Sequence, residues 1–339
     1  MAEGAAPAWK RRPEGGSRAM IALLVAIARH GGRGLARLCL WPITAYFVLV
    51  RGPERRASRA WLSRVQGRRA GLWAAARHVH AFSATILDRL FLLGGRMDLF
   101  DIRVHGLEPL EALVDQGRGA LLFGSHLGSF DALRVLARRR PGLQLRVVLD
   151  RGQNPVLTGL FDSLDPALAA AVIDGGQPGA AIALEIQHAL EAGALVALLV
   201  DRALPHEDTA AVPFLGRDAR LPLTPWRLAL ALHAPVLLCF GLYCGGNRYD
   251  LHFEPFLDAT VEGVPGGVPA RGDRAAWLRG RVADYAARLE HHARRTPLNW
   301  FNFYDFWNDD GPHADPPPNS ATAPAPAAGG AGDPVHRRA

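Results

Sequence analysis

The stretch that most constrains this chain is residues 120–134, which read ALLFGSHLGSFDALR. Its first four residues are apolar, as in a buried strand, and the run ends at Gly124. A helix-like pattern resumes after Ser129, which is a good N-cap residue. Gly124 and Gly128 allow a tight turn between the two segments. The stretch therefore predicts a strand, a turn that contains His126, and a helix.

Asp131 lies five residues after His126. On one continuous helix their side chains would be about 140° apart and would not meet, because each residue turns by about 100°. They can meet if His126 lies in the turn and Asp131 in the first helical turn, where the helix N-terminus favours a negative charge. A carboxylate there holds the tautomer of the imidazole. The spacing predicts a His126–Asp131 general base; the alternative is a chance neighbour pair without a role.

Strand-like and helix-like segments alternate along the rest of the chain. Strands are expected at residues 99–106, 145–149, 170–173, 194–200, 235–243 and 248–256, and helices at residues 53–93, 110–116, 178–191, 224–233 and 274–295. Residues 211–216 are expected to form a loop with a short extended piece. This alternation predicts an α/β fold, in which a mainly parallel twisted sheet is flanked by helices.

The N-terminal quarter differs from the rest in charge and hydropathy. Residues 1–80 hold one Lys and 14 Arg against three acidic residues, a net charge of +12, whereas the remainder carries −5. Apolar runs at residues 20–28 and 38–50 are each too short to span a bilayer, and Pro42 is expected to kink or break a helix. These features favour a monotopic or hairpin-like membrane anchor over nucleic-acid binding. One poor transmembrane helix and a pair of buried helices are the alternatives.

The charge and composition divide the chain into three parts. Residues 1–52 are predicted to associate with a membrane, with this end on the cytoplasmic side because of its positive charge. Residues 53–310 are predicted to form the folded domain. Residues 311–339 are rich in Pro, Ala and Gly and are predicted to be disordered. The aromatic residues 300–307 are expected to pack across the core, with a membrane interface as the alternative.

Cysteines and histidines suggest neither a disulfide framework nor a metal site. The three cysteines, Cys39, Cys239 and Cys244, indicate a reducing compartment. His105, His188 and the pair at residues 291–292 have no partner at ligand spacing, and we interpret them as surface or packing residues. No metal and no cofactor is therefore expected.

Several of these motifs resemble those of a known family. The His126-x4-Asp131 pattern resembles the first motif of the lysophospholipid acyltransferase superfamily, and the longer stretch GSHLGSFD resembles its lipid A biosynthesis branch, the lauroyl and myristoyl acyltransferases. The strand that ends at Asp201 and Arg202, the VPFLG loop at residues 212–216 and the PLNWF segment at residues 297–301 are similar to that branch. The likeness covers roughly residues 20–307. The branch usually has Glu in place of Asp131, and basic residues in place of Asn302 and Asp305.

The resemblance implies an acyltransferase at the cytoplasmic face of the inner membrane. It would move an acyl group from a thioester, on an acyl carrier protein or on CoA, to a hydroxyl or amine of a lipid or glycolipid. His126 would take the proton of the acceptor, and Asp131 would stabilise the imidazolium. The arginines of residues 51–77 would dock an acidic carrier protein or anionic lipid headgroups, and the sequence does not separate these two partners.

Four more residues are candidates for binding substrate or the oxyanion. Arg151, Asp201 and Arg202 follow strand ends, where ion pairing is the alternative role, and Gly216 fits a close approach of substrate or a simple turn. Two other functions remain possible from the sequence: an esterase or hydrolase on the same fold, and a non-catalytic lipid-binding or scaffold protein. The former lacks a placed Ser or Cys nucleophile, since GSHLG is no nucleophile elbow.

Overall fold

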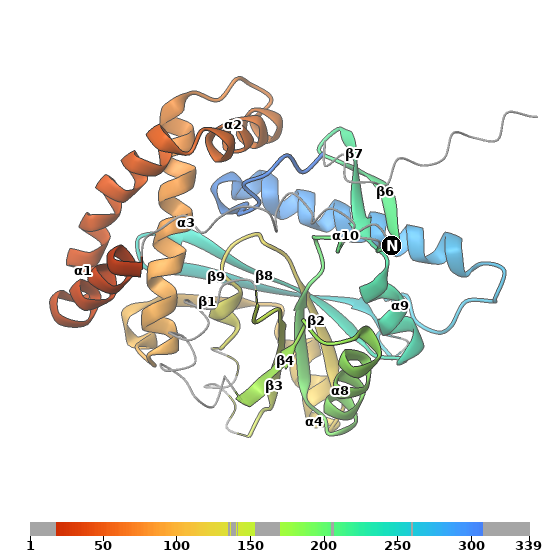
Figure 1. Cartoon of the computed structure of the whole chain (residues 1–339). Helices are drawn as coiled ribbons and strands as arrows, with labels where there is room; N and C mark the ends of the chain where they lie inside the picture. Colours follow the sequence, from red (N-terminus) through yellow and green to blue (C-terminus); the bar gives the residue numbers. More distant parts are fainter. Residues whose placement is uncertain are drawn as a thin grey trace, which may run out of the picture.

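A seven-stranded sheet forms the centre of the molecule, with strand order β1-β9-β8-β2-β5-β3-β4 (Figure 1). The computed structural model describes residues 18–134, 136, 140, 142–152, 170–204, 207–258 and 260–307. The strands of this sheet are β1 (Asp101–His105), β2 (Ala120–Gly124), β3 (Leu145–Leu149), β4 (Val172–Asp174), β5 (Leu195–Leu199), β8 (Val236–Gly245) and β9 (Arg248–Leu257). Only the hairpin partners β8 and β9 are antiparallel; the other neighbours are parallel. The predicted α/β fold with a mainly parallel sheet is confirmed.

Helices cover both faces of the sheet. They are α1 (Arg18–Val50), α2 (Gly52–Gln66), α3 (Leu72–Leu93), α4 (Glu108–Asp115), α8 (Gly179–Glu191), α9 (Thr224–Ala231) and α10 (Arg274–Arg295), with short 3-10 turns η1 (Met97–Leu99), η2 (Phe130–Arg134) and η3 (Pro297–Asn299). The predicted helix over residues 53–93 is broken by Gly67, which is left-handed with φ 66° and separates α2 from α3.

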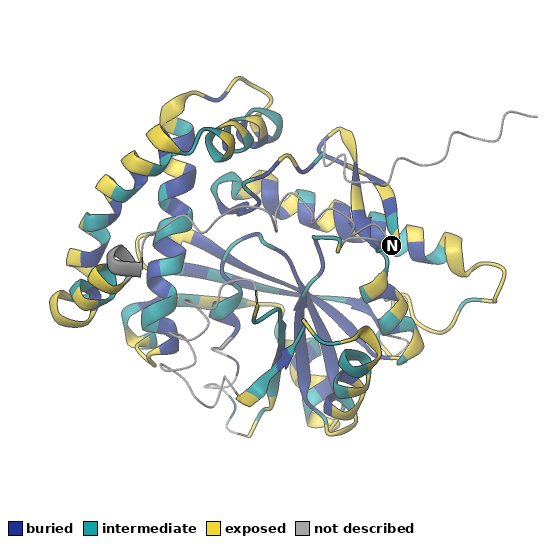
Figure 2. Cartoon of the chain, viewed as in Figure 1, coloured by how far each residue is buried: buried dark blue, intermediate teal, exposed yellow. Residues whose placement is uncertain are grey.

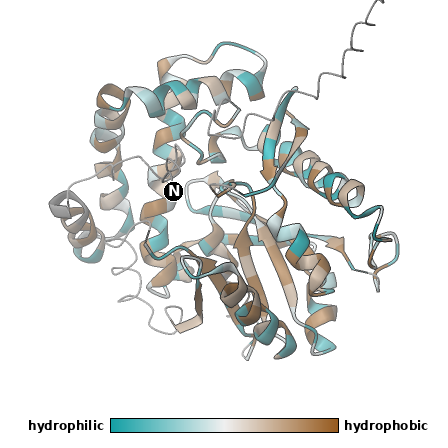
Figure 3. Ribbon diagram, turned by 45° about the vertical axis from the view of Figure 1, so that its right-hand side comes forward, coloured by the Kyte–Doolittle hydropathy of each residue, from teal (hydrophilic) through white to brown (hydrophobic). Residues whose placement is uncertain are grey.

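The apolar strands are buried on both faces, and this explains their continuous hydrophobic runs. On β2, Leu121 and Phe123 pack with α8, α9 and α10, whereas Ala120 and Leu122 pack with α3 and α4 on the other face. Figure 2 shows the sheet buried throughout its centre, and Figure 3 shows central strands of the sheet in the brown of apolar residues. Two separate cores thus hold the carboxyl ends of the central strands in fixed positions.

The VPFLG segment is part of a β-hairpin. β6 (Thr209–Phe214) and β7 (Arg217–Pro222) pair antiparallel around a turn in which Leu215 and Gly216 have φ values of 53° and 76°. The short extended piece predicted within residues 211–216 is present as the end of β6, but the surrounding loop that was predicted is a paired hairpin. A two-residue turn with positive φ at both positions matches the twist of a hairpin, and Gly216 tolerates that conformation.

The first helix bends at a glycine and continues through its proline. Gly32 has non-helical angles (φ 75°, ψ 179°), and Pro42 lies inside the second half of α1. The expected break at Pro42 thus falls at Gly32. The bend lets α1 lie along α3, where the Arg33 guanidinium forms two bonds of 2.7 and 2.8 Å with the buried carboxylate of Asp88. Tyr249 of β9 donates to the same carboxylate at 2.9 Å, so this ion pair joins α1 and α3 to the sheet.

The aromatic segment packs into the protein interior, as predicted. Trp300 is fully buried and stacks on Trp61 of α2, with ring centroids 4.6 Å apart. The backbone of the segment is held as well: Trp61 donates to the carbonyl of Pro297 at 2.7 Å, and the buried His78 of α3 lies 2.6 Å from the carbonyl oxygen of Trp300. Residues 1–17 and the predicted disordered tail at 311–339 lie outside the described residues.

Candidate active site

The site lies where two neighbouring parallel strands end. β2 pairs with β5 in a register that places Gly124 opposite Leu199. His126 is two residues beyond the first strand and Asp201 is two residues beyond the second. The register therefore brings these two side chains to the same point at the carboxyl edge of the sheet, where α/β proteins place their ligands.

Asp201 holds the imidazole of His126 through its ring and its backbone. Nδ1 of His126 lies 2.8 Å from Oδ1 of Asp201, and the backbone N–H of His126 donates to Oδ2 at 3.1 Å. The Asp201 side chain is fully buried, whereas the His126 side chain is 24% exposed. A buried carboxylate and an accessible imidazole form the arrangement of an oriented base.

A third donor comes from the aromatic segment. Nδ2 of Asn302 donates to Oδ2 of Asp201 at 2.9 Å, and its Oδ1 accepts from Nε of Arg202 at 2.6 Å. The backbone of the preceding residue also holds the site, because the N–H of Phe301 donates to the carbonyl of His126 at 2.8 Å. Asn302 thus links the carboxylate to the guanidinium and fixes both. No sequence motif predicts this role of Asn302, which lies where the family pattern has basic residues.

These contacts define the protonation states. Burial raises the pKa of Asp201, but the opposing effects of His126, Arg202 and Asn302 are stronger and lower it to about 2. The pKa of His126 is lowered from 6.5, chiefly by burial and then by the positive charge of Arg202. The negative charge of Asp201 raises this pKa, but by less than the other two effects lower it. At neutral pH the imidazole is therefore uncharged and the carboxylate ionised. Nδ1 then carries the proton that Asp201 accepts, and Nε2 keeps a lone pair.

Asp131 pairs with an arginine of α3 and not, as predicted, with the imidazole of His126. It lies in the first turn of η2, and its Oδ1 is 2.9 Å from Nε of Arg89 on α3. The carboxylate that holds the imidazole is Asp201, so the predicted contact between His126 and Asp131 is corrected. The reason is the path of the chain: residues 127–129 pair with Trp300 and with Gly241 of β8 before η2 begins, and this extended crossing separates the two side chains.

The other residues predicted to bind substrate lie along the carboxyl edge of the sheet or outside the sheet. Arg202 contacts the dyad through Asn302 and lies over the ring of Tyr304, 5.7 Å from its centroid. Arg151 follows β3, two strands away from β2, and its backbone N–H donates to Asp174 at 3.4 Å. Gly216 lies in the hairpin turn of β6 and β7. Substrate contacts of Arg151, Arg202 and Gly216 stay predictions.

The crossing at Gly128 is a point of close backbone approach. Gly128 has φ 86°, and a Cβ there would overlap the carbonyl oxygen of Gly241. Its N–H donates to the carbonyl of Asn299 at 2.8 Å, while the N–H of Ser129 donates to Gly241 at 2.6 Å. Glycine at this position is therefore a requirement for the path that carries His126 to Asp201.

Replacement of Gly128 by alanine should accordingly destabilise the protein. We expect Gly128→Ala to lower the free energy of unfolding by about 2 to 4 kcal/mol, because the methyl group adds both strain at positive φ and a backbone clash. Urea denaturation followed by circular dichroism measures this loss. Gly179→Ala is the matched control, since a Cβ at that site meets nothing within 4 Å; an equal effect of both variants would contradict the close approach.

The comparison with known families agrees with this geometry. The family model described as bacterial lipid A biosynthesis acyltransferase matches residues 89–304, which is well over half of the chain. The chain belongs to this family. A search of curated proteins finds no match to it. The predicted resemblance is thus confirmed at the level of the family.

Membership of the lipid A acyltransferase family indicates that the chain is an acyltransferase of lipid A-like type. The matched region contains His126, Asp201, Arg202 and Asn302, and it begins inside α3. α1 and α2 lie outside it. The site at the ends of β2 and β5 therefore lies inside the region that matches the family model.

The pH dependence of activity offers a test of the electrostatics at His126. With the neutral ring of His126 as the expected base, kcat/KM should be level around pH 7 and fall as the pH drops through the lowered pKa of His126, below 6.5. Removing the Arg202 charge in Arg202→Gln should move this acid limb to higher pH, while Arg202→Lys should keep it near the wild-type position. An acid limb above pH 6.5 in the wild type would contradict the assignment.

Proposed function

We propose that this protein transfers a fatty acyl group from a thioester to a hydroxyl or amine of a lipid A-like acceptor, with His126 as general base and Asp201 as its orienting carboxylate. The observation that carries the proposal is the 2.8 Å contact between Nδ1 of His126 and Oδ1 of Asp201 at the carboxyl edge of the sheet. It leaves Nε2 of a partly exposed, neutral imidazole as the basic atom.

The reaction needs one base and no covalent enzyme intermediate. Nε2 of His126 takes the proton from the acceptor hydroxyl as its oxygen attacks the thioester carbonyl. The carbon–sulfur bond then breaks, and the imidazolium returns the proton to the leaving thiolate. Asp201 stabilises the transient imidazolium through Nδ1, while Asn302 and the backbone of His126 keep the carboxylate in position. Acyl carrier protein and CoA are both suitable thioester carriers.

The first helix supports a membrane location for this reaction. Among the described residues, the stretch Ala22–Val50 is long and apolar enough to cross a membrane, and 22% of its apolar 18-residue window is buried. Exposed apolar side chains lie three residues apart at Leu35, Leu38 and Trp41, and Leu49 follows about two turns after Trp41, so these four share one side of the helix. Trp41 stacks on the exposed Trp73 of α3, 6.0 Å away. Exposed tryptophans beside arginines are typical of a membrane interface, and we propose association with the cytoplasmic face of the inner membrane.

Charges placed on this face should weaken membrane binding. Leu38 and Leu49 are 67% and 75% exposed, so their replacement leaves the core intact. We expect the double variant Leu38→Glu/Leu49→Glu to bind anionic phospholipid vesicles at least roughly tenfold more weakly, because each leucine loses about 1.5–3 kcal/mol of burial in lipid. Vesicle sedimentation measures it. Leu184→Glu on α8, 52% exposed, is the control and should bind normally; equal loss in both would refute this face as the membrane contact.

The acylation itself is tested with lipids from cells. Mass spectrometry of lipid extracts from cells with and without the gene should reveal one lipid class that gains an acyl chain only when the wild-type protein is present. The purified protein should then acylate that lipid from an acyl-thioester donor. A protein that releases free fatty acid from the thioester at the same rate with and without acceptor is a hydrolase, and a protein whose loss changes no lipid is a scaffold.

A further inference from the structure

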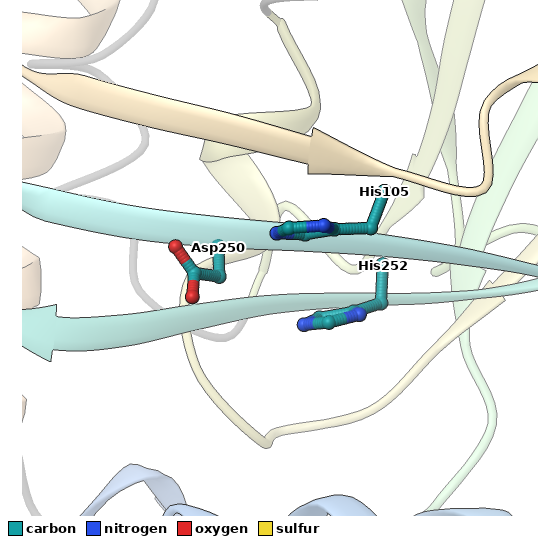
Figure 4. A group of neighbouring side chains, drawn as sticks. All are labelled: His105, Asp250 and His252. Carbon is teal, nitrogen blue, oxygen red and sulfur yellow. The ribbon is translucent and has the colours of Figure 1, made fainter.

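The face of the sheet beside its β1 edge carries histidines that the proposed reaction does not use. β1 and β9 run parallel in a register that places His105 directly opposite His252. Asp250 lies two residues before His252 on the same strand, and side chains two residues apart on a strand point to the same face. Three donor groups therefore project from one small area of the sheet, as Figure 4 shows for His105, Asp250 and His252.

We propose that His105, Asp250 and His252 bind one divalent transition-metal ion of the zinc type. Each residue offers a ligand atom, and these atoms all lie within 4.8 Å of one another. The two imidazoles are stacked with centroids 4.6 Å apart and planes 16° apart, so both rings face the same side. Two imidazoles and one carboxylate are a ligand set that zinc accepts, with water in the fourth position.

The ligands need only a small movement to close on an ion. Ligand atoms of a tetrahedral zinc site are about 3.3 Å apart, given metal–ligand distances of about 2.0–2.1 Å. His105 lies on the edge strand of the sheet and is exposed, so its ring can rotate toward the other two. The ion would then tie the edge strand β1 to β9 through side chains, in addition to their backbone bonds.

Arg248 is the group that competes with a cation here. Its guanidinium contacts both oxygens of Asp250, at 2.9 and 2.7 Å. Each carboxylate oxygen has a second lone pair, so Asp250 can hold Arg248 and one metal ion together. The positive charge of Arg248 nevertheless repels the ion. Its removal should therefore tighten metal binding.

The neighbouring histidines form a separate group. His292 lies 5.1 Å from His252 between ring centroids, but its Nε2 is 2.8 Å from Oε1 of Glu254 and its side chain is buried. Glu254 is also held by Arg288 at 2.6 and 2.7 Å. Nε2 of His292 thus pairs with Glu254, and among the described residues only His105, Asp250 and His252 meet the distance condition for a shared ion.

Zinc titration of the untagged, full-length protein tests the proposal. At pH 7.5, competition with a chromogenic chelator should show one tightly bound Zn²⁺ per chain. His105→Gln and His252→Gln should each weaken binding roughly tenfold or more, and Arg248→Gln should strengthen it. His188→Gln, at an exposed histidine of α8, is the control and should leave affinity unchanged. Zn²⁺ should also raise the melting temperature of the wild type, and a chelator should reverse this rise.

Two outcomes would overturn the site. One is wild-type zinc affinity in the His105→Gln protein. Residue 105 is exposed, so this variant is expected to fold. The other is loss of binding in His291→Gln with binding kept in His105→Gln, which would move the ion to the end of α10. Co²⁺ gives an independent readout in case His252→Gln fails to fold, because its visible absorption in the wild type reports imidazole ligands and should disappear in His105→Gln.

Discussion

Replacing His126 by alanine should abolish acyl transfer while the protein keeps its fold. Nε2 of His126 is the proposed base, and general-base catalysis contributes about 10²- to 10⁴-fold in rate. We therefore expect kcat/KM for transfer from an acyl-thioester to fall by roughly this factor in His126→Ala. The ring is partly exposed at 24%, so its removal leaves no large cavity in the core.

Two controls separate catalysis from folding. The circular dichroism spectrum and the vesicle affinity of His126→Ala should equal those of the wild type within error, because α1 and its apolar face lie far along the chain from residue 126. The melting temperature should fall, because the buried carboxylate of Asp201 loses a hydrogen-bond donor, but the protein should stay folded at the assay temperature. His188→Ala, on the exposed surface of α8, should keep full activity. Full acyl transfer by His126→Ala would remove this histidine from the mechanism, whatever the role of its neighbours.

The same variant distinguishes the candidate functions. A scaffold protein would keep its cellular role without the imidazole, whereas an acyltransferase would lose the acylated lipid. A hydrolase would lose thioester cleavage in His126→Ala but would show no dependence on acceptor in the wild type. The acceptor dependence of the wild-type rate and the loss in the variant therefore have to be measured together.

The strands of the site could be predicted because they are buried on both faces. Residues 120–123 and 194–200 read as continuous apolar runs, since helices cover both sides of the central strands. Their ends could be read from the first polar residues, which are Ser125-His126 and Asp201-Arg202. The sequence thus predicted both halves of the dyad as residues at strand ends.

The pairing of the two halves could not be predicted from local spacing. His126 and Asp131 are close in sequence, and the prediction joined them through a tight turn. Tertiary contacts override that turn: Gly128 and Ser129 bond to Asn299 and Gly241, which lie far later in the chain. That β5 lies beside β2 is a property of the strand order, and only this order shows that Asp201 meets His126.

Residues with a role set by a distant segment were the hardest to predict. Asn302 has no motif around it that marks a contact with Asp201, and its place depends on Trp300 being anchored on α2 and α3. The hairpin of β6 and β7 was missed because its strands are short and partly polar. The break of α1 was assigned to Pro42, although the flexible Gly32 absorbs the bend.

Replacing Asp201 by asparagine should disable His126 as a base, although asparagine has nearly the same shape as aspartate. In the wild type, Oδ2 of Asp201 accepts from the His126 backbone N–H and from Asn302, and Oδ1 accepts from Nδ1 of the ring. An asparagine keeps its single oxygen at the two N–H donors and turns its amide nitrogen toward Nδ1. Nδ1 must then accept, so the proton moves to Nε2 and the base is blocked. We expect kcat/KM to fall by roughly 10²- to 10⁴-fold.

Asp131→Asn is the matched comparison, because it makes the same chemical change at the carboxylate that the sequence pattern singles out. Its partner is Arg89 and not the ring, so we expect a loss of less than about tenfold from this partly exposed ion pair. Nitrogen-15 NMR of the His126 ring should show the proton on Nδ1 in the wild type and in Asp131→Asn, and on Nε2 in Asp201→Asn. If Asp131→Asn instead shows the large loss together with the tautomer change, then the five-residue spacing, and not the strand register, defines the base.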